Sequence, residues 1–325
     1  MSENNQELLR VEYLKKHFKV KRKYGAGKQV LKAVDNVSFT LNRGEVLGLV
    51  GESGCGKSTL GRTVLKLYDI TEGKVVFDGT DITNYNFKQM RNIRKNMQMI
   101  FQDPYASLNP RMTIGDIVMS PLNTFNLGEK KDRIDMVCEM LKKVGLSTEY
   151  LYKLPHEMSG GQRQRVVIAR AMISNPSFVV CDEPVSALDV SVRAQVLNLM
   201  KDMQDESQVA YLFISHDLST VKYVCDRIAV MYLGHIVEIA ESDELFKNPV
   251  HPYTQALLSA IPIPDVDQKR NRIILQGDVP SPINPPQGCP FKTRCTKYCA
   301  RCDEKIPALE DIDGNGHMVA CCNLD

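Results

Sequence analysis

The sequence predicts an α/β fold whose main part is a parallel sheet covered by helices. Short apolar runs at 178–181 and 210–215 have the length of buried strands, and an amphipathic helical pattern at 190–205 separates them. Strands that alternate with helices favour parallel pairing, with the helices on the faces of the sheet. A third apolar run, 45–50, leads into a glycine-rich turn and then into a helical pattern at 57–67. This order places the turn between a strand and a helix.

Size and charge limit the possible functions. At 325 residues the chain is long enough for one large domain with an appendage, or for two domains. Lys and Arg number 41 against 39 Asp and Glu, so the net charge of +2 predicts no general affinity for nucleic acids. The first residues lack the order of a signal peptide, and no apolar run approaches the roughly 18 residues that span a bilayer. We therefore expect a soluble, cytosolic protein.

The first half of the chain adds two further expected parts. Residues 8–16 and 33–41 alternate apolar and polar side chains, which predicts an antiparallel β subdomain. A basic hairpin joins these strands and turns at 25–27. Residues from about 103 to 157 are rich in helical patterns, clearest at 132–144, and are expected to form an inserted helical subdomain.

The second half ends in a change of composition. Strands at 227–231 and 235–238 flank Gly234 as a hairpin. From Pro262 onward prolines and cysteines predict irregular chain. The expected domains are therefore a large α/β domain at 1–262 and a small cysteine-rich C-terminal extension at 263–325.

The turn after the third apolar run is a complete phosphate-binding loop, Gly-x4-Gly-Lys-Ser, in the required strand-to-helix context. Glycines let backbone N–H groups curl round phosphates, Lys57 reaches the β and γ oxygens, and Ser58 ligates Mg²⁺. An ordinary glycine turn is the alternative that this context disfavours. Cys55 is expected to fill space rather than to act as a nucleophile. The expected nucleotide-binding residues are Gly51, Glu52, Ser53, Gly54, Cys55, Gly56, Lys57, Ser58 and Thr59.

The strand at 178–181 ends in two adjacent carboxylates, Asp182 and Glu183. Their side chains point to opposite sides of the strand, so the two groups can take different roles. Asp182 is expected in the Mg²⁺ shell, and Glu183 is expected to orient and polarise an attacking water. Such a pair by itself is more often a solvated strand end or a helix cap. Because the same chain contains a phosphate loop, a role for this pair in a nucleotide site becomes the favoured interpretation.

A second anion-binding turn, Ser159-Gly160-Gly161-Gln162, opens another helical pattern. It offers unpaired backbone N–H groups, a hydroxyl and the positive end of a helix dipole to a phosphate. One chain therefore contains two phosphate-binding helix starts.

The order of these motifs resembles an ATP-binding cassette (ABC) transporter ATPase along the whole chain. The resemblance rests on the phosphate loop, Gln102, the Met158-to-Gln162 signature, Asp182 with Glu183, the run Ser186, Ala187, Leu188 and Asp189, and His216. It implies that Gln102 contacts Mg²⁺ and senses a membrane partner. It also implies that the run from Ser186 is the D-loop and that His216 contacts the γ-phosphate.

Two further residues can be compared with this family's pattern. Met158 replaces the commoner leucine of the signature, a change that conserves volume. Phe18 lies where the family stacks an aromatic ring on adenine, with Tyr24 as the second candidate and an ordinary strand aromatic as the structural alternative.

The resemblance explains why one chain has two phosphate sites. In ABC ATPases two subunits meet head to tail, and each ATP lies between the phosphate loop of one subunit and the signature of the other. Ser159, Gly160, Gly161 and Gln162 would then bind ATP in trans. Closing and opening of the pair would drive alternating access in a membrane protein that docks near Gln102 and the helical insert.

The stretch from Asn248 through His251, Pro252 and Tyr253, with the tail behind it, resembles the dipeptide/oligopeptide (and nickel) importer branch. A surface helix that begins at a proline is the structural alternative. The branch implies a peripheral ATPase on the cytoplasmic face of the membrane. Its implied partners are a second, similar ATPase chain, two transmembrane permease subunits and an extracytoplasmic substrate-binding protein. Import of nickel or another small solute, and a soluble ABC ATPase acting on nucleic acid, are the alternative functions.

Six of the ten cysteines lie between residues 289 and 322. In a reducing compartment such a group indicates metal or cluster ligation before disulfides. The resemblance implies Cys289, Cys295, Cys302 and Cys321 around a [4Fe-4S] cluster. Spacing alone also allows zinc, or cysteines without a metal, and Cys299 with Cys302 is an alternative pair.

Overall fold

The computed structural model describes residues 7–21, 28–261 and 272–324, and these divide into two compact units. Unit 1 contains Asn42–Glu45 and Asn84–Ile214 together with the first described residues up to Leu8. Unit 2 contains Leu9–Leu41, Val46–Thr83 and the chain from Ser215 onward. The hairpin turn expected at 25–27, the candidate Tyr24 and the domain boundary expected near 262 lie outside the described residues.

Unit 1 contains the predicted parallel strands. β6 (Met97–Ile100), β7 (Phe178–Asp182) and β8 (Ala210–Ile214) pair in parallel, with β7 in the middle. Every residue of β7 and β8 is buried, which explains why their sequences are continuous apolar runs. The helices α2 (Phe87–Arg94), α6 (Gly160–Met172) and α7 (Val190–Ser207) belong to the same unit. The sequence predicted β7, α7 and β8 within two residues of their observed bounds.

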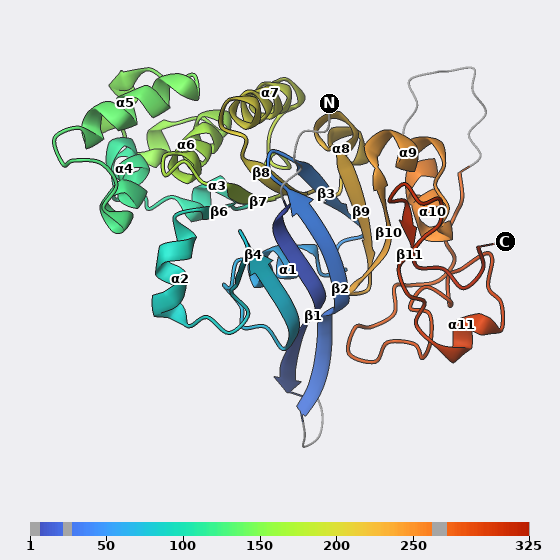
Figure 1. The fold of residues 1–325 in the computed structure, drawn as a ribbon. Coiled ribbons are helices and arrows are strands. Elements are labelled where there is room, and N and C mark those ends of the chain that lie inside the picture. Colours follow the sequence, from blue (N-terminus) through green and yellow to red (C-terminus); the bar gives the residue numbers. More distant parts are fainter. Residues whose placement is uncertain (1–6, 22–27, 262–271, 325) are drawn as a thin grey trace, which may run out of the picture. The chain divides into compact units, whose positions relative to one another are not determined.

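The segment at 103–157 is helical, as the sequence predicts. It contains α3 (Pro104–Ser107), α4 (Ile114–Phe125), α5 (Arg133–Lys143) and two 3₁₀ turns, η1 (Thr148–Tyr152) and η2 (Pro155–Glu157). The hydroxyl of Thr113 accepts the backbone N–H of Asp116 and so fixes the start of α4. α4 packs on α5, on η1 and on α6. These helices, coloured teal to green in Figure 1, thus rest on the helix that begins at the Ser-Gly-Gly turn.

Unit 2 contains an antiparallel sheet in the order β2-β1-β4-β5. Its strands are β1 (Glu7–Lys21), β2 (Lys28–Asn42), β4 (Glu72–Phe77) and β5 (Thr80–Asp81). β4 pairs antiparallel with both β1 and β5. The register between β1 and β4 shifts between Glu12 and Lys15, where Tyr13 has a φ of 49°. Such a bulge bends the strand and turns its side chains.

Unit 2 also contains the strands that hold the phosphate loop. β3 (Val46–Val50) pairs in parallel with β9 (Arg227–Tyr232), and β9 forms the predicted antiparallel hairpin with β10 (His235–Glu241). Two short strands of the tail, β11 (Glu310–Asp311) and β12 (Met318–Val319), continue the sheet beyond β10. The remaining helices of the unit are α1 (Lys57–Val64), α8 (Leu218–Val224), α9 (Ser242–Lys247), α10 (Pro252–Ser259) and α11 (Arg301–Glu304). Nowhere in the ranges that the structure describes is a helix both long and apolar enough to cross a membrane.

A buried carboxylate joins the tail to this sheet. Glu238 on β10 is fully buried and accepts the backbone N–H groups of Val250 and His251 at 2.9 and 3.0 Å. Its Oε1 also lies 2.7 Å from Nε2 of His317, a buried residue just before β12. A carboxylate is buried at low cost only when it is fully hydrogen-bonded. Glu238 therefore orders both the start of α10 and the end of the tail.

A helix does begin at Pro252, but its first turn is not on the surface, where the structural alternative placed it. Pro252, Tyr253 and Thr254 in the first turn of α10 are buried. His251 caps this helix, because its Nδ1 accepts the N–H of Tyr253 at 3.1 Å. Burial lowers the pKa of His251 to about 3. The ring is thus neutral in the folded protein, as its role as an acceptor requires.

This buried histidine predicts a loss of stability in mild acid. Below about pH 6.5 the unfolded chain protonates His251, whereas the folded protein does not. The free energy of unfolding should therefore fall with decreasing pH by about 1.4 kcal/mol per pH unit from this residue, between pH 6.5 and the folded pKa. Urea unfolding of the wild type and of His251→Asn, which keeps a capping acceptor, measures the difference in slope. Equal slopes for both proteins would contradict the buried neutral ring.

Candidate functional site

The phosphate loop joins β3 to α1, and two of its glycines have no room for a side chain. A Cβ on Gly51 would lie 2.1 Å from the carbonyl oxygen of Met231, and a Cβ on Gly56 would lie 2.1 Å from that of Ala33. Both glycines also have positive φ values, 151° and 112°, which other residues rarely adopt. Gly54, by contrast, has a φ of 82° and would place a Cβ in open space. The loop is thus closed toward the protein and open at Gly54, where a ligand can approach its backbone.

Lys57 lies at the start of α1 and is 6% exposed. Its Nζ donates to the carbonyl oxygens of Gly51 and Glu52 at 2.7 and 3.0 Å and approaches Sγ of Cys55 at 3.7 Å. The ammonium group is therefore held inside the curve of the loop. Burial raises the pKa of Cys55, so this cysteine stays a thiol, in agreement with its expected role as a filler.

Glu52 is held by two residues to which no motif assigned such a role. Its backbone N–H donates to the hydroxyl of Tyr253 on α10 at 2.8 Å. Its carboxylate accepts two hydrogen bonds from Arg294, at 2.8 Å from Nη1 and 3.2 Å from Nη2. This pairing raises the pKa of Arg294. Tyr253 stood out in the sequence only as part of a family pattern, and Arg294 is 242 residues away from Glu52, so no local signal could have predicted either contact.

Unit 1 brings together the predicted Gln102 and Glu183. Nε2 of Gln102, just after β6, donates to Oε2 of Glu183 at 2.8 Å. Asp182, the last residue of β7, is buried. Glu183 has a φ of 48°, a left-handed conformation that costs about 1 kcal/mol or more outside glycine. Its N–H donates to the carbonyl of Ile214 at 3.0 Å, which holds the residue in place.

The Ser-Gly-Gly turn is the capped start of α6. The hydroxyl of Ser159 accepts the N–H of Gln162 at 3.3 Å, and Oε1 of Gln162 accepts the N–H of Ser159 at 2.9 Å. This reciprocal pair is a capping box. Gln162 is further fixed by a 2.8 Å hydrogen bond to the hydroxyl of Tyr150 in η1. The turn that was predicted to bind phosphate is therefore held by side-chain hydrogen bonds without a ligand, and the N–H of Gln162 is already paired within it.

Gly161 also has a packing role that the sequence did not indicate. A Cβ at this position would lie 2.4 Å from Cγ1 of Val192 on α7. The run Ser186 to Asp189 precedes α7, and there the hydroxyl of Ser186 donates to the carbonyl of Glu183 at 3.1 Å. Leu188 is buried, and Asp189 lies at the N-cap of α7. Glycine at 161 thus lets α6 approach α7 closely.

The remaining predicted residues of the nucleotide site lie in unit 2. Phe18 on β1 is partly exposed and packs edge to face with Tyr68, with ring centroids 5.5 Å apart. Lys16 lies over the same ring at 4.8 Å. Tyr68, which the sequence analysis missed, is therefore a second aromatic candidate for base stacking. His216 directly follows Ser215 and is exposed.

The six tail cysteines are neighbours but do not form a metal site in this structure. Sγ of Cys299 and Sγ of Cys302 lie 3.7 Å apart. Burial, with the charge of nearby thiols, raises the pKa of Cys289 to about 11 and that of Cys322 to about 12. Among the described residues, no three His, Cys, Asp or Glu side chains are arranged to hold a metal ion. The predicted iron–sulfur cluster therefore finds no support in this geometry.

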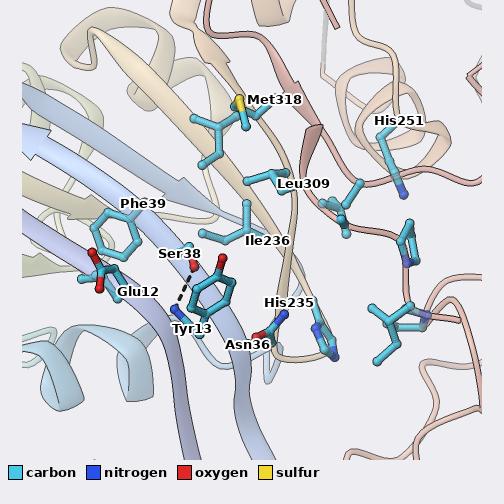
Figure 2. A pocket seen from close by; sticks show the side chains of 18 of the residues that line it. Glu12, Tyr13, Asn36, Ser38, Phe39, His235, Ile236, His251, Leu309 and Met318 are labelled. Carbon is cyan, nitrogen blue, oxygen red and sulfur yellow. Dashed lines mark hydrogen bonds between the residues drawn. The ribbon is translucent and has the colours of Figure 1, made fainter. Parts of the chain in front are cut away.

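Unit 2 also contains a pocket of about 580 Å³. Figure 2 shows Phe39, Ile236, Leu309 and Met318 among its lining residues, with the hydrogen bond from Tyr13 N–H to Ser38 nearby. One wall is the tail segment from Cys289 to Phe291. None of the phosphate-loop residues lines it.

Comparison with known proteins gives the family. The ABC transporter family matches residues 34–186, and the family described as oligopeptide/dipeptide transporter, C-terminal region, matches residues 237–302. The putative oligopeptide transport ATP-binding protein YkfD of Bacillus subtilis is 53% identical over 97% of this chain and 94% of its own length. The oligopeptide transport ATP-binding protein AppF of the same organism is 51% identical over 98% of each chain.

The chain belongs to the ABC transporter ATP-binding proteins of the oligopeptide/dipeptide branch. A putative peptide import ATP-binding protein of Brucella ovis is also 51% identical, over 97% of both chains. This ABC protein accordingly couples ATP hydrolysis to transport, and ATP with Mg²⁺ is the nucleotide form expected for such an ATPase.

Solved structures agree with the fold of the ABC protein. The ATP-binding cassette MJ0796, in a dimeric post-hydrolysis state bound to ADP and Pi, has a TM-score of 0.64 and 27% identity, covering 72% of this chain and 99% of its own. CbiO1 of Clostridium perfringens, part of the cbiONQ transporter complex, has the same TM-score and 28% identity, covering 74% of this chain and 91% of its own. The predicted ABC ATPase core is confirmed.

The contact of Gly161 with Val192 can be tested by stability measurements without nucleotide. Gly161→Ala should lower the free energy of unfolding by about 1–3 kcal/mol, because the β-branched Val192 cannot turn away from the new methyl group. Val192→Ala in the same chain should restore most of this loss. Gly160→Ala is the matched control, since its Cβ would meet nothing closer than 4.0 Å. Urea unfolding gives all four values, and equal stability of the two alanine variants at 160 and 161 would contradict the packing role.

Proposed function

We propose that this protein is the ATP-hydrolysing subunit of a membrane importer that takes up dipeptides or oligopeptides. The observation that carries the proposal is that one chain matches both the ABC transporter family and the C-terminal region of oligopeptide/dipeptide transporters. Relatives named as oligopeptide transport or peptide import proteins match it over nearly their whole lengths. Import of nickel or of another small solute by the same type of ATPase is the second candidate for the cargo.

The proposed reaction is hydrolysis of ATP to ADP and phosphate. Gly51 to Thr59 hold the phosphates, Lys57 binds the β and γ oxygens, and the ring of Phe18 stacks on the adenine. Ser58, Gln102 and Asp182 would hold Mg²⁺ through the oxygen ligands that it prefers, and the bound ion would supply positive charge beside the phosphates. Glu183 takes a proton from water as the water oxygen attacks the γ-phosphorus and the bond to the ADP oxygen breaks. His216 contacts the γ-phosphate.

Gln102 is proposed to report the state of this reaction to the membrane partner. Its 2.8 Å hydrogen bond to Glu183 supports this role. Because the amide of Gln102 donates to the proposed general base, it has to rearrange when a water molecule takes its place as donor to that carboxylate. A shift of the loop from Gln102 into α3 would carry this change toward a docked permease.

We propose that the active form is a head-to-tail pair of ATPase subunits. Ser159, Gly160, Gly161 and Gln162 would bind the γ-phosphate of an ATP held by the partner subunit, and Ser186 to Asp189 would line the same interface. The rigid capping box at Ser159 supports this role, because a preorganised anion site loses little entropy on binding. The related cassette MJ0796, which is dimeric in its solved structure, also supports it.

The proposed partners follow from the proposed transport cycle. They are a second ATPase chain that is similar but not identical, two transmembrane permease subunits and an extracytoplasmic substrate-binding protein. The chain would lie on the cytoplasmic face of the membrane and bind no nucleic acid. Its proposed domains remain a nucleotide-binding domain at 1–262, including the helical part at about 103–157, and an extension at 263–325.

The importer proposal is tested by isolating the complex from membranes. Tagged protein extracted in a mild detergent should bring down multispanning subunits that mass spectrometry identifies. The purified complex, reconstituted in vesicles, should take up labelled peptide only with MgATP present. Uptake of nickel without uptake of peptide would select the second candidate, and ATP turnover stimulated by DNA or ribosomes would overturn the importer proposal.

Glu183→Gln tests the base and the dimer together. An amide cannot accept the proton from water, so we expect turnover to fall by about 100-fold or more while ATP binding remains. The variant should accumulate as an ATP-bound dimer in size-exclusion chromatography. Adding Ser159→Arg should abolish this dimer, and Glu149→Gln, an exposed change in η1, is the control that leaves turnover intact. Unchanged hydrolysis by Glu183→Gln would show that another group is the base.

We also propose that the tail cysteines bind a metal centre, with Cys289, Cys295, Cys302 and Cys321 around a [4Fe-4S] cluster and zinc as the alternative. The crowding of six of the ten cysteines between residues 289 and 322 of the sequence supports the proposal, because such a group in a reducing compartment indicates metal ligation before disulfides. Anaerobically purified protein should contain stoichiometric iron or zinc by elemental analysis. Cys295→Ser should lose it, while Cys138→Ser on α5 should not. A folded, metal-free wild type would refute the proposal.

A further inference from the structure

We propose that Arg294 in the cysteine-rich tail is a positioning residue for the phosphate loop, so that nucleotide affinity depends on the folded tail. The inference rests on the proposed function, because it assumes that the loop at 51–58 binds ATP. It concerns residues of unit 2 only, and it starts from the bidentate contact between Arg294 and Glu52.

The contact has the geometry of a strong and directional ion pair. The two guanidinium nitrogens donate to the two carboxylate oxygens at 2.8 and 3.2 Å. The side chain of Arg294 is 8% exposed and that of Glu52 is 29% exposed. A planar, two-point pair that is largely shielded from water fixes orientation as well as distance. A lysine at 294 could supply the charge but not the second hydrogen bond.

The pair acts on a residue that is part of the loop itself. The carbonyl oxygen of Glu52 accepts Nζ of Lys57 at 3.0 Å, and its N–H donates to Tyr253 at 2.8 Å. Glu52 is therefore held at three groups by three residues: Arg294 binds its side chain, Lys57 its carbonyl oxygen and Tyr253 its N–H. If Arg294 is removed, Glu52 is held only through the hydrogen bonds of its backbone.

Charge gives a second reason for the pair. The carboxylate of Glu52 belongs to a loop that must accept a polyanion, and an unpaired negative charge there opposes binding. Arg294 neutralises this charge from the protein side. The tail thus makes the loop more favourable to phosphate without contacting the nucleotide.

The position of Arg294 depends on the fold of the tail. Three residues earlier, the ring of Phe291 is buried and packs edge to face with Tyr232 at 5.2 Å and against Tyr253 at 5.4 Å. The N–H of Arg294 donates to the carbonyl of Phe291 at 3.0 Å, which turns the chain toward the loop. The guanidinium carbon lies 6.0 Å from the centre of the Tyr232 ring. An aromatic cluster therefore anchors the segment between Cys289 and Cys295 beside the loop.

The test compares nucleotide affinity and turnover in variants of the full-length chain. Arg294→Ala should raise the Kd for MgATP and the KM about tenfold, with kcat at saturating MgATP unchanged, because charge-assisted hydrogen bonds of this kind are lost. Arg294→Lys should show a smaller rise, of a few fold. Lys292→Ala is the matched control, because it removes a 2.6 Å ion pair with Asp303 in the same tail without touching the loop.

A double-mutant cycle with Glu52→Gln assigns the effect to this contact. The double variant Glu52→Gln/Arg294→Ala should lose less affinity than the two single changes predict together. If Arg294→Ala does not fold, the lysine variant and the control still decide the question. Wild-type affinity in both Arg294 variants, or an equal loss in Lys292→Ala, would overturn the inference. A wild-type protein that does not bind MgATP would instead refute the proposed function.

Discussion

The phosphate loop is closed by backbone on its inner side, and much of unit 2 is arranged around that constraint. Carbonyl oxygens of Met231 and Ala33 occupy the places that side chains at Gly51 and Gly56 would need. The N–H of Gly234 donates to the carbonyl of Cys55 at 2.9 Å, so the β9–β10 hairpin meets the loop directly. Because these contacts are between backbones, they tolerate no insertion or change of register. At Gly54, by contrast, a Cβ would meet no atom within 4 Å, so the backbone there is open to a ligand.

Local patterns predicted the elements that carry the chemistry. The parallel strands, the loop, the acidic pair and the Ser-Gly-Gly helix start are each defined by neighbouring residues, and each forms where the sequence placed it. β12 was missed because a strand of two residues, Met318 and Val319, has no period to detect. It forms because β10 offers an unpaired edge and Glu238 holds His317 beside it. Pairing with a distant strand thus decides whether so short a segment becomes a strand.

The sequence proposes the residues of the candidate site by type and order, but it does not give their contacts. Gln102 and Glu183 were selected from motif order, and the structure adds that they touch. Gly161 was selected for phosphate binding, yet its contact with Val192 shows that helix packing also requires a glycine there. The contacts of Tyr253 and Arg294 with Glu52 could not be predicted, because each of the two residues lies more than two hundred positions away from Glu52 in the sequence. A sequence motif identifies the groups that meet a ligand, whereas the groups that hold the motif come from elsewhere in the fold.

The two residues of the ion pair between Glu52 and Arg294 are made at very different times during synthesis. Glu52 leaves the ribosome 242 residues ahead of its partner. Until the tail emerges, the nascent chain has a complete Gly-x4-Gly-Lys-Ser sequence beside an uncompensated carboxylate. In a chain that terminates before Arg294, the carboxylate of Glu52 never gains its arginine partner. The tail therefore completes a motif that was translated more than two hundred residues earlier, and on the proposed role of Arg294 a truncated copy would bind nucleotide more weakly.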